Sequence, residues 1–119
     1  MKRDMDLVRK LLLYLEEMNP YNREVPICID GYGLDQIEYH GFLLVDAGLA
    51  TGVDTTTFEN RQPEYFLTGL TWAGHEFLEA ARNENNWKKS KEKYAGVVGF
   101  SLGVLQALLI ALRKEQIDV

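Results

Sequence analysis

Apolar residues near the start of the chain recur with the period of an α-helix. Between residues 4 and 18 they fall three or four positions apart, which places them on one helical face. They are Leu7, Val8, Leu11, Leu12, Leu15 and Met18. Asp4 is suited to cap the start of this helix, and Pro20 excludes the helical conformation from Asn19. The pattern therefore predicts a helix over residues 4–18.

The next segment alternates between strand and helix patterns. A short apolar run predicts a strand at 25–29, which Pro26 restricts to the edge of a sheet because proline lacks an N–H. A second helix is predicted over 34–47, where apolar residues again share one side, and Gly48 is expected to end it.

A hairpin and two further helices complete the prediction. The hairpin strands are expected at 49–57 and 64–70, with a polar loop between them. A third helix is predicted over 71–93, with Trp72 on its buried side, and Asn83, Asn85 and Asn86 weaken it near the middle, where a break can occur. After a glycine-containing connector, a last helix runs from Ser101 to about Glu115.

This order of elements predicts an α+β fold. A helix that ends in a glycine turn, a two-stranded wing, and a return to a capped helix are typical of a winged-helix-like domain with additional C-terminal helices. A chain of 119 residues fits a single domain. We expect a core over 1–93, and a C-terminal helix over 94–119 that packs on this core or on a dimer partner.

The charge distribution changes the functional picture. The net charge is −5, and residues 16–84 carry only Arg23, Arg61 and Arg82 against many carboxylates. Such a surface disfavours contact with phosphates, which need Lys and Arg nearby. An anionic partner is therefore expected to approach the more basic chain ends.

Five segments of the chain resemble a bacterial and phage family, the domain-of-unknown-function family twenty-five thirteen. These segments are residues 1–7, 37–40, 46–49, 70–78 and 87–93. The resemblance covers nearly the whole chain, more loosely past Tyr94. It implies a winged-helix-like fold in the bacterial cytosol or in a prophage-encoded setting, and it implies no activity, substrate or catalytic residue.

The sequence indicates no catalytic or cofactor site, so we expect a protein that is not an enzyme and has neither cofactor nor metal. No nucleophile motif, phosphate loop or dinucleotide fingerprint is found. Cys28, Asp30, His40 and His75 lack the close pair spacing of zinc ligands. His40 is expected to be a packed, hydrogen-bonded core residue. The single cysteine and the lack of a signal-peptide pattern favour the cytoplasm.

The leucines of the last helix are the first candidate interface. Residues 95–112 carry no charge and reach the length of a minimal membrane span, but glycines dilute the segment and its leucines lie on one face. We therefore expect no membrane partner, and a helix buried against Leu7–Leu15 in the same chain or across a homodimer. The candidate dimer residues are Leu102, Leu105, Leu108, Leu109 and Leu112.

A lysine cluster is the second candidate site. Lys88, Lys89, Lys91 and Lys93 could contact nucleic-acid phosphates, or they could form a solvated surface that keeps the chain soluble. Two hypotheses follow. One is a homodimeric protein-interaction or adaptor module whose acidic second helix and wing face an unknown protein partner. The alternative is a DNA-binding transcriptional regulator of bacterial or prophage origin.

Overall fold

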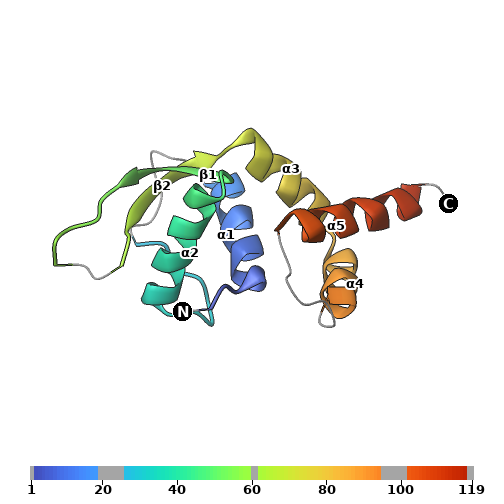
Figure 1. Cartoon of the computed structure of the whole chain (residues 1–119), viewed down its shortest axis with the longest axis horizontal. Coiled ribbons are helices and arrows are strands. Elements are labelled where there is room, and N and C mark those ends of the chain that lie inside the picture. Colours follow the sequence, from blue (N-terminus) through green and yellow to red (C-terminus); the bar gives the residue numbers. More distant parts are fainter. Residues whose placement is uncertain (1, 19–25, 60–61, 95–101, 118–119) are drawn as a thin grey trace. The chain divides into compact units, whose positions relative to one another are not determined.

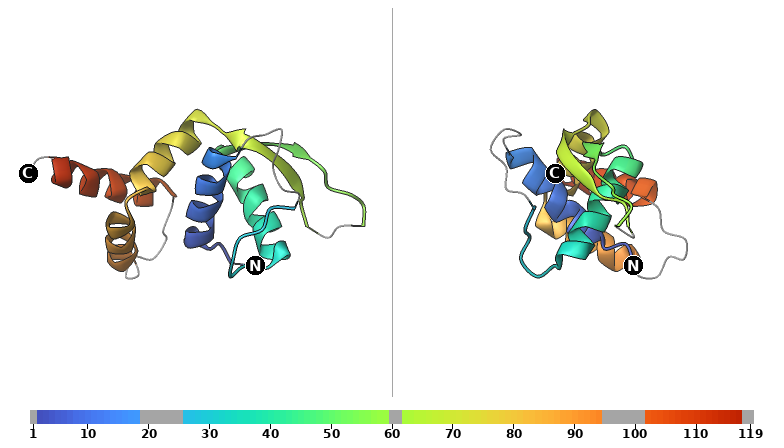
Figure 2. Two further views of the ribbon diagram at one scale, coloured as in Figure 1. Left: turned by 180° about the vertical axis from the view of Figure 1, so that it is seen from behind. Right: turned by 90° about the vertical axis from the view of Figure 1, so that its left-hand side faces the viewer.

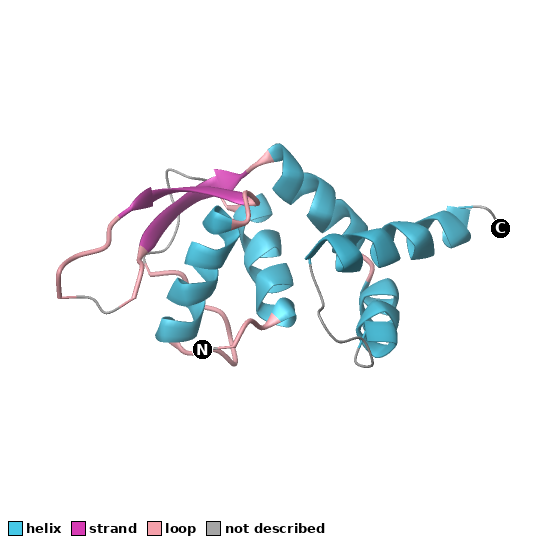
Figure 3. Cartoon of the chain, in the orientation of Figure 1, coloured by secondary structure: helices cyan, strands magenta, loops and turns pink. Residues whose placement is uncertain are grey.

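The computed structural model describes residues 2–18, 26–59, 62–94 and 102–117, and these residues form an α+β structure (Figures 1 and 3). The α+β class predicted from the sequence is thereby confirmed. The described elements are helices α1 (Met5–Glu17), α2 (Leu34–Asp46), α3 (Trp72–Ala81), α4 (Glu84–Tyr94) and α5 (Leu102–Ile117), and strands β1 (Ala50–Asp54) and β2 (Tyr65–Leu70).

The backbone divides into two compact units, Met1–His75 and Glu76–Val119. In the first unit, α1 and α2 lie side by side and the hairpin of β1 and β2 packs across them (Figures 1 and 2). In the second unit, α4 packs against α5. The expected organisation, a single domain with a core over 1–93 and a C-terminal helix over 94–119, stays a prediction.

Helix α1 forms where its apolar stripe predicts it. The carboxylate of Asp4 accepts hydrogen bonds from the N–H groups of Asp6 (2.9 Å) and Leu7 (3.2 Å), which satisfies two of the free donors at the helix start. Its buried residues are Leu7, Val8, Leu11, Leu12 and Leu15. These side chains make α1 the central core helix of the first unit, in contact with α2 and β2.

The end of α2 places the hairpin directly against the core. Gly48 adopts a φ of 75°, a left-handed conformation that favours glycine, and so it ends the helix as the sequence predicts. The N–H of Leu49 donates to the carbonyl of Leu44 (2.9 Å), which turns the chain back into β1. Strand β1 then pairs antiparallel with β2, from Ala50 opposite Leu70 to Asp54 opposite Tyr65.

The prediction of a strand at 25–29 is wrong for residues 26–29, which are the residues of this range that the structure describes. Residues 26–29 are irregular, and the described sheet contains only β1 and β2. Burial does alternate here, because Ile27 is buried while Cys28 is exposed. However, Pro26 has no N–H for a ladder, and the carbonyl of Ile29 is taken by the N–H of Tyr32 in a turn (3.2 Å).

The single helix expected over 71–93 is two helices, α3 and α4, and the break lies at the asparagine-rich segment that weakens the helical pattern. The side chain of Asn83 accepts the N–H of Asn86 (3.0 Å), and its carbonyl accepts the N–H of Trp87 (2.9 Å). Asn83 therefore caps a new helix, α4, because its short side chain satisfies a free donor at the helix start.

The expectation that Trp72 is buried is also wrong, because its side chain is 80% exposed. The buried side of the first turn of α3 is instead formed by Gly74, where a Cβ would overlap the carbonyl oxygen of Leu49. Thr71 fixes this approach. Its hydroxyl donates to the carbonyl of Gly48 (2.6 Å) and accepts the N–H of Gly74 (3.0 Å).

The second unit has a small core of its own. Its buried apolar residues include Phe77, Leu78, Trp87, Leu105 and Leu109. The hydroxyl of Ser90, itself fully buried, donates to the carbonyl of Trp87 (2.8 Å), so this polar group is satisfied. Each helix in the described part of the chain is too short or too polar to span a lipid bilayer.

Candidate functional site

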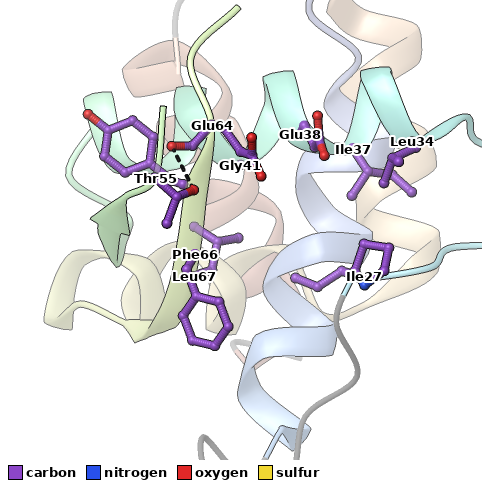
Figure 4. Close-up of a pocket in the computed structure, with 11 residues that line it drawn as sticks. Ile27, Leu34, Ile37, Glu38, Gly41, Thr55, Glu64, Phe66 and Leu67 are labelled. Carbon is purple, nitrogen blue, oxygen red and sulfur yellow. Dashed lines mark hydrogen bonds between the residues drawn. The ribbon is translucent and has the colours of Figure 1, made fainter. Parts of the chain in front are cut away.

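A groove in the unit Met1–His75 is the main candidate site (Figure 4). We call it the α2–hairpin groove, and its cavity volume is about 240 Å³. It is lined by Pro26, Ile27, Leu34, Ile37, Glu38, Gly41, Thr55, Glu64, Tyr65, Phe66 and Leu67. Pockets for drug-sized molecules span about 300–1,000 Å³, so this cavity suits one or two side chains of a partner.

Helix α2 supplies one wall of the groove by simple helical spacing. Leu34, Ile37 and Gly41 follow one another at intervals of three and four residues, so they share one face. At Gly41 a Cβ would lie 3.4 Å from Leu67 of β2, which shows how closely the helix and the hairpin approach. Leu34 stays 47% exposed and leaves apolar surface open at the start of α2.

The hairpin supplies the opposite wall. Hydrogen bonds continue past the ends of β1 and β2 and fix the adjoining residues of the hairpin. The carbonyl of Glu64 accepts the N–H of Thr55 (2.9 Å), and the Thr55 hydroxyl also donates to it (Figure 4). The N–H of Glu64 donates to the Thr56 hydroxyl (2.9 Å). The side-chain amide of Gln62 reaches the carboxylate of Glu38 and the carbonyl of Asp35, each at 3.4 Å. These bonds connect the hairpin to α2 beside the cavity.

The groove is negatively charged. Glu38 and Glu64 line it, and Asp35 is exposed on the first turn of α2. In the described stretches 26–59 and 62–75 no lysine or arginine occurs. Asp54 lies at the end of β1, where hydrogen bonds from the hydroxyl and the N–H of Thr56 lower its pKa and favour the carboxylate. A cationic group is therefore the charged group that fits this surface.

His40 has a structural role, as the sequence predicts. Its ring is fully buried, and Nε2 lies 2.8 Å from the backbone N of Asp4 while Nδ1 lies 2.7 Å from the carbonyl of Gln36. Because the Asp4 N–H can only donate, Nε2 must accept and Nδ1 carries the proton. Both ring nitrogens are therefore occupied, which leaves neither for a metal or a substrate.

The other histidine, carboxylate and cysteine side chains do not converge in the part of the chain that is described. His75 and Cys28 are both exposed. No group of three or more His, Cys, Asp or Glu residues in that part is placed to hold a metal ion.

Most of the candidate dimer leucines are buried within one copy of the chain. Leu105 is 1%, Leu109 0% and Leu112 6% exposed, and Leu108 is partly exposed. The side chain of Leu102 lies outside the described residues. Arg113, on the same helix, pairs with Glu79 at 4.0 Å. The role of these leucines in a dimer, and the packing of α5 on Leu7–Leu15, stay predictions.

The four candidate lysines all lie on α4 with exposed side chains: Lys88, Lys89, Lys91 and Lys93. Lys89 and Lys93 are four residues apart and so are surface neighbours on the helix. Neither of these two has an acidic partner among the residues that the structure describes. Contact of the cluster with nucleic acid stays a prediction.

The comparisons with known proteins identify the family. The family model described as "Hypothetical protein (DUF2513)" matches residues 2–100. The chain belongs to the DUF2513 family. The resemblance noted in the sequence is thereby confirmed. A relative from Haemophilus influenzae, named "Uncharacterized protein", is 34% identical over 92 residues, which are 76% of each chain. No solved structure matches the chain.

The acidic second helix and hairpin were predictable from the sequence, but the groove was not. Its walls come from segments far apart in sequence, such as Ile27 and Leu67. The available signal was the stripe of Leu34, Ile37 and Gly41, in which a glycine stands at a core-facing helical position.

Proposed function

We propose that this DUF2513 protein is a non-enzymatic protein-interaction module with a winged-helix-like first unit. The α2–hairpin groove binds a cationic segment of a protein partner. The observation that carries this proposal is an apolar cavity bordered by carboxylates, with no lysine or arginine among the residues that line it.

A long cationic side chain has an apolar stem and a charged head, and both fit such a groove. Its aliphatic stem can lie against Leu34 and Ile37 while its charged head reaches Glu38. An exposed ion pair contributes at most about 1 kcal/mol. Burial contributes about 0.8 kcal/mol for each CH₂, so the stem supplies most of the affinity and the carboxylate supplies the preference for a cation.

The charge on α2 favours a protein partner over DNA. In winged-helix proteins that read DNA, the helix before the wing enters the major groove. Here α2 leads directly into the hairpin, but it carries Asp35, Glu38 and Asp46 and neither lysine nor arginine. Phosphate contacts supply much of the affinity for DNA, and this helix has no lysine or arginine to make the charged ones.

Selection from a random peptide library on the immobilised protein tests the proposal. Enriched peptides should carry Lys or Arg beside an apolar residue, and Glu38→Gln should weaken their binding by at most about fivefold. Asp46→Asn is the matched control, because Asp46 is exposed at the far end of the same helix and does not line the groove. Peptides without a cationic residue, or peptides that bind Glu38→Gln as tightly as the wild type, would refute the groove as the partner site.

A DNA-binding regulator is the second candidate, and the observation that favours it is the exposed lysine cluster of α4. Duplex DNA binding measured across salt concentrations separates the two. A steep loss of affinity with salt, removed by Lys89→Ala with Lys93→Ala, would support the regulator because it reports released phosphate counterions. Under our proposal the protein does not bind duplex DNA at physiological salt.

A further inference from the structure

Two pairs of like charges on this chain, one basic and one acidic, have similar spacing. Lys89 and Lys93 are separated by one helical turn on α4, about 6 Å along the axis. Asp35 and Glu38 are separated by three residues on α2, about 4.5 Å along the axis. Two cations on one helix can therefore meet two carboxylates on another at the same time.

The basic pair is unbalanced within its own helix. Like charges four residues apart repel each other, and in the described part of the chain neither Lys89 nor Lys93 has a carboxylate within ion-pair distance. On the acidic side, the carboxylate of Glu38 accepts a long hydrogen bond from the side-chain amide of Gln62 (3.4 Å). Both pairs gain favourable interactions when they meet a surface of opposite charge.

We propose that the occupant of the α2–hairpin groove is helix α4 of a second copy of this chain. This inference rests on the proposed function and names its partner. Lys89 and Lys93 of one copy face Asp35 and Glu38 of the other, and the lysine methylene groups cover Leu34 and the mouth of the cavity.

Symmetry allows this contact to form twice. In a dimer with a twofold axis, the α4 of each copy occupies the groove of the other, so two charged contacts act together. Exposed charges are screened over about 10 Å at 0.1 M salt. The dimer should therefore weaken as the ionic strength rises.

A charge exchange between two variants tests the proposal. One variant carries Asp35→Lys and Glu38→Lys, so its groove and its α4 are both basic. The other carries Lys89→Glu and Lys93→Glu, so both are acidic. Sedimentation equilibrium at about 20 mM salt should show a wild-type dimer, each variant as a monomer, and a heterodimer when the two variants are mixed.

Two controls keep the test specific. Asp46→Lys with Glu59→Lys makes the same change in net charge at exposed positions outside the groove, and this variant should still dimerise. Circular dichroism should show equal helix content in all variants. If one variant fails to fold, salt titration of the wild-type dimer and the single substitution Glu38→Gln still measure the contact, and each should raise the dissociation constant about tenfold.

The outcomes separate this inference from the proposed function. A wild-type monomer at low salt, or a wild-type dimer with no heterodimer in the mixture, would overturn the second copy as occupant. If cationic peptides still require Glu38 in that case, the groove remains a partner site for another protein. Association that disappears after nuclease treatment would instead show a nucleic-acid bridge and would overturn the inference.

Discussion

Gly74 offers a sharp test of how α3 joins the hairpin. In Gly74→Ala the new Cβ would overlap the carbonyl oxygen of Leu49 and lie 3.0 Å from its carbonyl carbon. These are backbone atoms, and that carbonyl also accepts the N–H of Thr71 (3.1 Å). The chain can relieve the overlap only by moving α3 away from β1, which lengthens this hydrogen bond.

The sign of the effect follows from three magnitudes. Alanine in place of glycine favours the helix by about 1 kcal/mol. Overpacking costs about 1–3 kcal/mol, and the weakened hydrogen bond costs about 1 kcal/mol. Gly74→Ala should therefore lower the free energy of unfolding by about 1–3 kcal/mol, measured by urea denaturation at 25 °C with the helix signal as the probe.

Gly41→Ala is the matched control, because Gly41 also lies inside a helix. Its Cβ would meet only the side chain of Leu67, at 3.4 Å, an ordinary contact distance from which a side chain can move. The helix gain should then dominate, and stability should stay the same or rise by up to about 1 kcal/mol. Equal stability of Gly74→Ala and the wild type would refute the close packing of α3 on Leu49.

Three further predictions concern single side chains. His40→Phe should lower the free energy of unfolding by about 1–3 kcal/mol in urea denaturation, because the N–H of Asp4 loses its acceptor. Asn83→Ala should cost about 0.5–2 kcal/mol through loss of the α4 cap, measured in the same way, while Asn83→Asp retains a cap. Burial, followed by the charges of Asp4 and Asp6, raises the pKa of Tyr32, so this phenol should ionise above its ordinary range in an ultraviolet titration compared with Tyr32→Phe.

The raised pKa of Tyr32 also determines how the stability of the fold changes at alkaline pH. In the unfolded chain this tyrosine loses its proton first as the pH rises past about 10, which favours unfolding until the folded form ionises as well. Tyr32→Phe should lack this part of the alkaline loss. Identical alkaline stability profiles of Tyr32→Phe and the wild type would contradict the raised pKa of Tyr32. If His40→Phe is as stable as the wild type, the hydrogen bond to the buried histidine does not stabilise the fold. If Asn83→Ala leaves the stability unchanged, Asn83 does not act as a stabilising cap of α4.

The sequence predicted the elements whose signals are local. The stripe of α1, the glycine stop at Gly48 and the break near Asn83 depend on residues within a few positions of each other, and the structure has all three. The prediction that Trp72 is buried was wrong because helical periodicity cannot show which face of the helix a neighbouring strand covers. That face was decided by Leu49, more than twenty residues away.

The candidate site depended even more on long-range packing. The acidic character of α2 was visible in the sequence, but the cavity required the approach of Leu67 to Gly41 and the position of Ile27. The strand pattern at 25–29 misled for a related reason. Alternating burial there comes from Ile27 entering the core, and no ladder partner is available in the described sheet.

The junction at Thr71 has a consequence for local opening of the chain. Three hydrogen bonds connect the end of α2, the start of β1 and the first turn of α3. They are made by the N–H and the hydroxyl of Thr71 and by the N–H of Gly74. Segments joined by such bonds open and close as one cooperative group in hydrogen exchange. The amides at the start of α3 should therefore exchange at the slow rate of the hairpin, while the α4 amides follow a separate rate. The boundary between the two exchange groups would then fall inside a continuous helix.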